Sequence, residues 1–208
     1  MRLVIAVVLG VLVRTVVRFR RLPANRPATS GGGVRQRGDQ RGDVGAVMIG
    51  ANDLFAMRAS RLAAGRTTTL ESYAANLTSI VRELRPTGAR IALMSVQVLG
   101  ERLDAPENVD MDRVNAVVRR VAAAEGVAYL PFNERLKELV RGGDRPFRDS
   151  PAPVLVAALL HLGLGIGLDR IGRWHGVRVH TEGLHLAGAG GSAAADLVAE
   201  FLTVGSPS

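Results

Sequence analysis

The chain of 208 residues is long enough for one ordinary domain with a hydrophobic core. Its composition, 47% apolar and 22% charged, is typical of a globular protein and argues against a disordered chain. Because it contains no cysteine, the sequence excludes disulfides, zinc–thiolate sites, iron–sulfur clusters and thiol nucleophiles.

The formal net charge of +8 is confined to residues 1–42, which hold nine arginines and a single acidic residue, Asp39. The remainder of the chain carries equal numbers of acidic and basic side chains. A strongly basic protein often binds nucleic acid or an anionic membrane. Because the excess lies outside the rest of the chain, we expect no nucleic-acid partner. Binding of anionic lipid or nucleic acid by this basic N-terminal leader is an alternative function.

Residues 1–22 form an apolar and basic leader with two interpretations. The run Leu3–Val13 is shorter than the roughly 20 residues that span a bilayer, and a basic cluster follows it at Arg18, Arg20 and Arg21. Charge placed after the run favours an uncleaved membrane anchor over a signal peptide. The protein would then be membrane-associated, with its domain on the cytoplasmic side. The alternative is a buried β-strand in a cytoplasmic protein, and the two interpretations weigh equally.

Residues 23–43 are rich in Pro, Gly and Arg and contain almost no large apolar side chains. Such a segment buries too little surface to fold, so we expect a linker. The organisation predicted is therefore a leader at 1–22, a linker at 23–43 and a domain at 44–208.

From residue 44 onwards, short apolar runs alternate with amphipathic segments. Thr68 and Glu71 have the spacing of a capping box for one helix, and Asn133 is a candidate N-cap for another. Strands separated by helices imply a parallel sheet covered on both faces, hence an α/β fold. The predicted strands are 44–49, 90–96 and 127–130, and the predicted helices are 69–85, 111–121, 134–140, 153–168 (loosened by glycines) and 193–202.

The tetrapeptide Gly50-Ala51-Asn52-Asp53 directly follows the first of these strands. In an open α/β sheet, ligands bind beyond the carboxyl ends of the strands, where this segment falls. Gly50 permits a sharp turn, and the Asn52 amide is a neutral donor that can stabilise an oxyanion. Taken alone, the Asn-Asp pair is more typical of a cap on the following helix.

A second polar cluster, Thr181-Glu182-Gly183-Leu184-His185, precedes the last predicted helix. A carboxylate three residues before a histidine can hold the imidazole through its Nδ1–H. Nε2 is then available as a general base. Glu182 and His185 are therefore candidate catalytic residues.

In this order, the two clusters resemble the blocks of the SGNH (GDSL-like) hydrolases, a family of esterases, lipases and acyl hydrolases with a three-layer, flavodoxin-like α/β/α fold. Gly50, Asn52 and Asp53 match the family's Gly-x-Asn-Asp block. Glu182 to His185 match its Asp-x-x-His block, with Glu in place of Asp. The resemblance covers residues 43–203. It implies that Gly50 and Asn52 supply oxyanion-hole donors, that His185 is the base and that Glu182 orients it.

The family's first block, Gly-Asp-Ser, has no counterpart in this sequence, so its nucleophilic serine is missing. The first strand of the sheet is therefore expected to be missing or replaced, for example by Leu3–Val13. Ser30 is a candidate for a relocated nucleophile, although it lacks the rigid turn that nucleophilic catalysis needs. The sequence thus predicts an ester hydrolase acting on a small or lipid-like substrate. The alternative is an inactive, truncated relative that serves as a binding or vestigial module.

The spacing of the histidines does not suggest a metal site. His175, His180 and His185 are five residues apart, which suits neither one helix face nor a zinc finger. We expect no cofactor and no metal.

Overall fold

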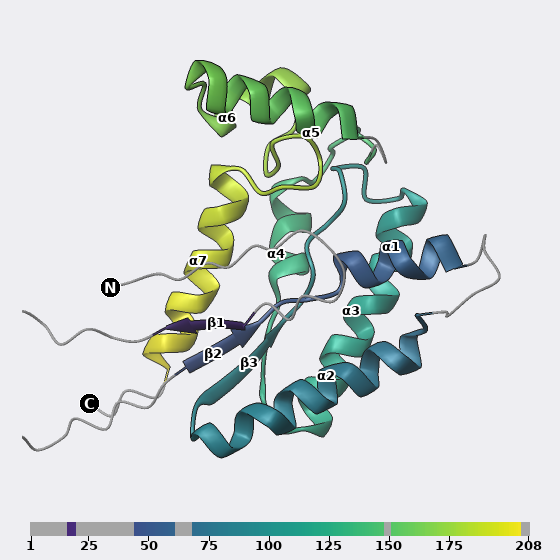
Figure 1. The fold of residues 1–208 in the computed structure, drawn as a ribbon, viewed down its shortest axis with the longest axis vertical. Coiled ribbons are helices and arrows are strands. Elements are labelled where there is room, and N and C mark those ends of the chain that lie inside the picture. The colour runs from purple at the N-terminus through teal and green to yellow at the C-terminus, as the bar shows by residue number, and fades with distance from the viewer. Residues whose placement is uncertain (1–15, 20–43, 61–67, 148–150, 205–208) are drawn as a thin grey trace, which may run out of the picture.

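The computed structural model describes residues 16–19, 44–60, 68–147 and 151–204, and its centre is a four-stranded sheet in the order β1-β2-β3-β4 (Figure 1). Strands β2, β3 and β4 are parallel, whereas β1 pairs with β2 in the antiparallel direction, Val16 opposite Val47. The strands are β1 (Val16–Phe19), β2 (Val44–Val47), β3 (Arg90–Met94) and β4 (Ala128–Leu130).

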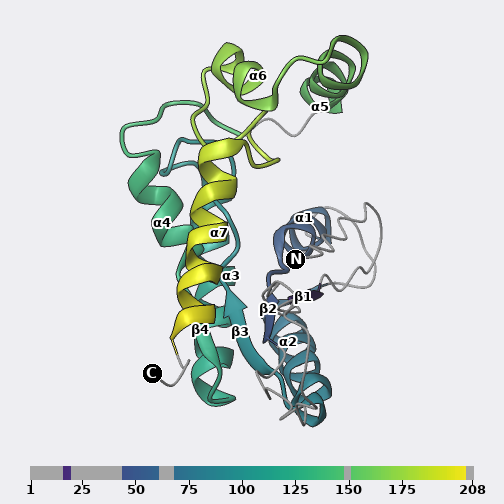
Figure 2. The same ribbon diagram turned by 90° about the vertical axis from the view of Figure 1, so that its left-hand side faces the viewer.

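Helices cover both faces of this sheet. Figure 2 shows α4 and α7 on one side of the strands, and α1 and α2 on the other. The helices are α1 (Ala51–Ser60), α2 (Leu70–Leu84), α3 (Pro106–Ala124), α4 (Phe132–Leu139), α5 (Pro151–Ala158), α6 (Leu168–His175) and α7 (Gly188–Thr203), with a 3₁₀ turn η1 (Arg85–Thr87) and a π-helical turn η2 (Leu159–Gly163).

Alternation along the strands produces two separate cores, because successive side chains of a strand point to opposite faces. Val47 and Leu93 pack with buried side chains of α2 and α3. Ala46 and Ala92, their neighbours in sequence, pack with α4 and α7. The expected three-layer α/β/α class is confirmed.

The position beside β2 is occupied by residues 16–19, which belong to the basic leader. The pairing runs from Val16 opposite Val47 to Phe19 opposite Val44. The segment Leu3–Val13, expected as a possible replacement strand, lies outside the described residues. No helix among the described residues combines the length and apolar character needed to cross a bilayer.

Two predicted caps are wrong in detail. Helix α2 begins one residue later than expected, and its capping box joins Thr69 and Ser72 instead of Thr68 and Glu71: each hydroxyl accepts the other residue's backbone N–H, at 3.1 and 2.9 Å. The N-cap of α4 is Pro131, so Asn133 lies inside the helix. Its buried amide donates to the carbonyl of Val96 at 2.8 Å, a tertiary contact that local propensity does not contain.

The C-terminal region also differs from the expected elements. The predicted helix 153–168 divides into α5 and η2, and a further helix, α6, follows that the apolar periodicity did not indicate. Helix α7 begins at Gly188, five residues earlier than predicted. The first turn of α7 packs closely on the segment before it, since a Cβ on Gly190 would lie 2.4 Å from the carbonyl oxygen of Val179.

Candidate active site

Gly50 ends the extended segment after β2 in a turn that only glycine fits. Its φ is +139°, outside the range that L side chains normally adopt. A Cβ there would lie 2.7 Å from both Tyr73 Oη and Val96 Cγ2. The Tyr73 hydroxyl donates to the carbonyl of Ile49 at 2.7 Å, so the backbone before the turn is also held.

Asn52 and Asp53 occupy the first turn of α1. The first hydrogen bond of this helix runs from the Leu54 N–H to the Gly50 carbonyl at 2.9 Å, so Asn52 is inside the helix and is not its cap. The Asn52 side chain is exposed and makes no hydrogen bond within the described part of the chain. Burial raises the pKa of the Asp53 carboxyl above its ordinary value. The turn therefore presents an unused amide at a helix N-terminus, where the helix dipole favours developing negative charge.

Glu182 and His185 lie in a tight loop closed by a hydrogen bond from the Thr181 N–H to the His185 carbonyl at 2.8 Å. Glu182 Oε1 accepts the backbone N–H of His185 at 3.0 Å and is also hydrogen-bonded to His185 Nδ1. An ionised carboxylate can only accept, so Nδ1 is the protonated nitrogen and Nε2 carries the free lone pair. Gly183, with φ of +104°, allows the chain to turn back this sharply.

The two side chains differ in exposure, and each shifts the pKa of the other. The Glu182 side chain is 4% exposed and the His185 side chain 46%. The hydrogen bond to Glu182 raises the pKa of His185, and this outweighs the opposite effect of burial. Burial raises the pKa of Glu182, but its hydrogen bonds with His185 bring it below its ordinary value. The pair thus combines a shielded carboxylate with a half-exposed imidazole.

The segment after β3 holds this loop in place. The Gly100 N–H donates to the Gly183 carbonyl at 2.7 Å, and Gln97 Nε2 donates to the Leu184 carbonyl at 2.5 Å. The loop that carries Glu182 and His185 is therefore positioned by a segment more than 80 residues earlier in the chain.

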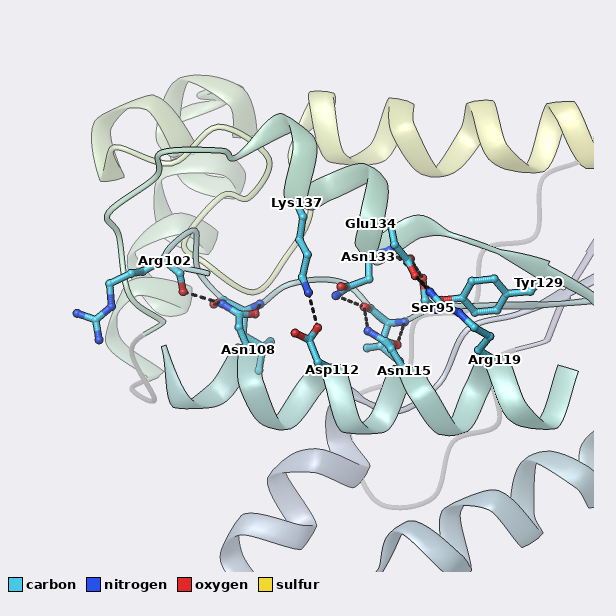
Figure 3. Close-up of polar contacts among 12 residues, drawn as sticks. Ser95, Arg102, Asn108, Asp112, Asn115, Arg119, Tyr129, Asn133, Glu134 and Lys137 are labelled. Atoms are coloured by element: carbon cyan, nitrogen blue, oxygen red, sulfur yellow. Dashed lines mark hydrogen bonds and ion pairs between the residues drawn. The ribbon is translucent and has the colours of Figure 1, made fainter. Parts of the chain in front are cut away.

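Two asparagines of α3 fasten the same segment (Figure 3). Asn115 bonds the N–H and carbonyl of Val96 at 2.7 and 2.9 Å. Asn108 bonds the N–H and carbonyl of Leu99, both at 2.8 Å. These amides replace the strand partners that an irregular segment lacks, so its buried backbone groups are satisfied and its path is fixed.

Phe147 connects the two candidate blocks. Its ring lies 5.5 Å from that of Phe55 in α1 and is in reach of Gly183 in the loop. Ala51 and Leu184 pack against the same hydrophobic core. Both blocks therefore lie at the edge formed by the carboxyl ends of the parallel strands. No hydrogen bond among the described residues joins Asn52 to Glu182 or His185, and the catalytic roles of Gly50, Asn52, Glu182 and His185 stay predictions.

The serine nearest to a strand end in this region, Ser95, is not available as a nucleophile. It is completely buried, accepts the backbone N–H of Asn133 at 2.8 Å and contacts the Glu134 carboxylate at 3.1 Å. Ser30 lies outside the described residues.

Sequence reasoning missed Glu101, which holds the backbone that leads into the loop. Its side chain is 1% exposed, and Oε1 accepts the backbone N–H groups of Arg178 and Val179, the latter at 2.9 Å. The available signal was the acidic residue that follows Gly100 after an apolar strand, a pattern too common to single out.

The histidines have separate surroundings. His175 Nδ1 bonds the Thr181 carbonyl at 2.8 Å, His180 is buried, and His185 bonds Glu182. Within the described residues, no group of three or more histidine, aspartate or glutamate side chains is placed to hold a metal ion.

A family model described as the GDSL-like lipase/acylhydrolase family matches residues 6–163 of the chain. The match includes residues 6–43, which contain no Gly-Asp-Ser, and it ends before Glu182 and His185. No curated protein matches.

Among solved structures, the chain is similar to an α/β hydrolase enzyme from the metagenome of Lake Arreo in Spain and to an acetylxylan esterase from Geobacillus stearothermophilus. In each comparison the sequence identity is 18%, the TM-score is 0.52, and the match covers 76% of this chain and 58% of the other. The chain thus spans little more than half the length of these proteins, and the likeness concerns the fold.

Proposed function

We propose that this chain, which belongs to the GDSL-like lipase/acylhydrolase family, hydrolyses carboxylic esters with His185 as the general base. The observation that carries the proposal is the contact between Glu182 and His185 Nδ1, which orients the half-exposed imidazole and does not use Nε2. This is the arrangement that a general base in acyl transfer requires.

The other roles follow from the positions of the two blocks. Nε2 of His185 accepts the proton of the attacking hydroxyl and delivers it to the departing alkoxide. Where that hydroxyl belongs to a serine, the acyl group is left on the serine oxygen. Water then attacks the acyl carbon, His185 takes the proton of the water and returns it to the serine, and the carboxylic acid leaves. The carbonyl oxygen of the ester becomes an oxyanion, for which the Asn52 amide and the Gly50 N–H are the candidate donors. Glu182 stabilises the imidazolium formed between these steps, and the raised pKa of His185 expresses the same attraction in the resting state.

The two candidate blocks do not supply the hydroxyl that attacks the ester. Ser30 is the only serine in residues 1–43, the part of the chain in which the family's nucleophile would be expected. A small acyl group is a suitable first substrate, because one of the similar structures is an acetylxylan esterase. A lipid-like ester is the other substrate class to test.

The test is turnover of p-nitrophenyl acetate and butyrate by the full chain, its His185→Ala variant and a His161→Ala control. His161 is an exposed histidine in η2, remote in sequence from both blocks. We expect the His185 change to reduce kcat/KM by at least about a hundredfold, the scale of general-base catalysis, and the His161 change to leave it intact. Equal activity of all three proteins would refute the mechanism.

The missing Gly-Asp-Ser block favours a second candidate, a non-catalytic relative that only binds ligands. A fluorophosphonate probe separates the two, because it labels activated serines. Labelling that disappears in Ser30→Ala identifies the nucleophile. Turnover that depends on His185 without labelling indicates attack by water, and the absence of both labelling and turnover supports the non-catalytic candidate.

A further inference from the structure

Helices α5 and α6 lie at one end of the molecule (Figures 1 and 2). Exposed apolar side chains are concentrated in these helices and in η2 between them. Leu162 is 83% exposed, Leu159 70% and Trp174 59%. Seven of the ten large apolar side chains that are exposed in the described residues lie between residues 155 and 174: Leu155, Val156, Leu159, Leu162, Leu164, Leu168 and Trp174. We call residues 155–174 the apical surface.

Apolar side chains are exposed on more than one face of α5 and η2. Leu155 and the adjacent Val156 are both exposed, and the exposed Leu159 and Leu162 follow them in η2. These two elements together span 13 residues, or about 20 Å, too short for the roughly 30 Å core of a bilayer. An apolar helix of this length suits lying in an interface better than crossing it.

The charges beside these leucines indicate what covers them. Arg170 and Arg173 of α6 are exposed and have no ion-pair partner among the described residues. Asp169 is the only acidic residue between 151 and 181, and its carboxylate accepts the Gly188 N–H at 2.5 Å, at the start of α7. The surface is therefore apolar with a positive margin and an exposed Trp174, a residue type enriched where protein meets lipid headgroups.

We propose that the apical surface docks on a membrane containing anionic phospholipid. The leucines of α5 and η2 and the Trp174 ring enter the headgroup region, and Arg170 and Arg173 contact lipid phosphates. A second copy docked through the same surface would provide no carboxylate for Arg170 and Arg173. The only acidic residue of that surface, Asp169, already accepts the Gly188 N–H. This proposal does not rest on ester hydrolysis.

Docking would also place the candidate catalytic loop close to the membrane. Helix α6 is in direct contact with that loop, because a Cβ on Gly172 would lie 2.5 Å from the His180 carbonyl oxygen. His175, the last residue of α6, bonds the Thr181 carbonyl at 2.8 Å. Any ester presented by the lipid surface would then approach Glu182 and His185 from the α6 side.

The chain provides its own probe, because Trp174 is its only tryptophan. The emission of the full chain is recorded with vesicles of phosphatidylcholine and with vesicles that also contain phosphatidylglycerol, and binding is measured by cosedimentation. We expect a blue shift with the anionic vesicles and quenching by brominated phospholipid. Both effects should weaken as salt is added.

Paired variants locate the binding. We expect Leu159→Ser with Leu162→Ser to weaken vesicle binding roughly tenfold or more, because the docked protein loses two leucines that enter the headgroup region. Val109→Ser with Leu139→Ser, which changes two exposed apolar side chains of α3 and α4, should leave binding intact. Circular dichroism verifies that the parent and both double variants are folded.

Charge variants complete the test. Arg170→Gln with Arg173→Gln should lower affinity for anionic vesicles about tenfold to thirtyfold, at about 1 kcal/mol per arginine. Arg135→Gln with Arg141→Gln is the matched control on exposed arginines elsewhere.

Three outcomes overturn the proposal. Vesicle binding that leaves Trp174 emission and the leucine variant unaffected assigns lipid binding to the basic leader. A dimer in vesicle-free solution that dissociates in the leucine variant assigns the surface to a second copy. No binding to anionic vesicles removes the proposal altogether.

Discussion

Glu101 and His180 are buried side by side, with 3.9 Å between Glu101 Oε1 and His180 Nδ1. Burial lowers the pKa of His180 to about 4, so the imidazole is neutral at pH 7 and the contact is not an ion pair there. Neither ring nitrogen of His180 has a hydrogen-bond partner among the described residues. The Glu101 carboxylate instead binds the backbone N–H groups of Arg178 and Val179.

Replacing Glu101 by Ala is therefore expected to be strongly destabilising. The change leaves two buried N–H groups without an acceptor and opens a cavity, for a loss of about 3 kcal/mol or more in the free energy of unfolding. Urea denaturation measures the loss. Glu138→Ala, which removes a side chain that is 62% exposed, is the control and should stay within about 0.5 kcal/mol of the parent. A loss of similar size in both variants would contradict the role assigned to Glu101.

The lowered pKa of His180 predicts a loss of stability in mild acid. Its pKa is about 4 in the folded state and 6.5 as the ordinary value, so the unfolded chain binds the proton first as pH falls. Above pH 6.5 the neutral His180 leaves the free energy of unfolding at its full value. As the pH falls from 6.5 towards 4, that free energy decreases by about 3 kcal/mol in all. His180→Leu should show a shallower decline of the unfolding free energy over this range. The exposed control His161→Leu should follow the parent; if His180→Leu follows it as well, the assignment fails.

The pKa of His185 should depend on Glu182. The carboxylate raises it, so Glu182→Gln should move it down towards its ordinary value, as followed by the titration of the His185 Cε1–H resonance in NMR. Ester hydrolysis should rise with pH through the pKa of His185, since only the neutral imidazole accepts a proton. The rise should therefore begin at lower pH in Glu182→Gln. Glu138→Gln is the control, and a His185 resonance insensitive to Glu182 would argue against the pairing in solution.

Gly50→Ala should destabilise the protein by about 3 kcal/mol or more, because the methyl group clashes with Tyr73 and Val96 in addition to the backbone strain. Gly88→Ala separates the two effects. Its φ is +70° and nothing lies within 4 Å of the added Cβ, so strain alone costs about 1 kcal/mol. Thermal unfolding of both variants measures the difference, and equal melting temperatures would mean that the clash is relieved without cost.

Much of the layered fold could be predicted because its signals are local. Strand β2 and, after Arg90, strand β3 are continuous apolar runs, and α2 has apolar side chains at a period of 3.6 residues, so both signals lie in consecutive positions of the sequence. The same is true of Glu182 and His185, whose side chains meet within one short loop. Helix α6 was missed because its eight residues are fewer than the 11 or more over which a helical period can be recognised.

The sequence by itself determined that the chain is an α/β protein without thiol chemistry and that its basic excess belongs to residues 1–42. It also placed the carboxylate–imidazole pair three residues apart. Only the tertiary structure decided that Asn133 is an internal anchor for Val96, and that Glu101 holds the backbone of Val179. These contacts join residues that are 37 and 78 positions apart in the sequence. Such pairs depend on how the helices pack on the sheet, and no local sequence pattern encodes that packing.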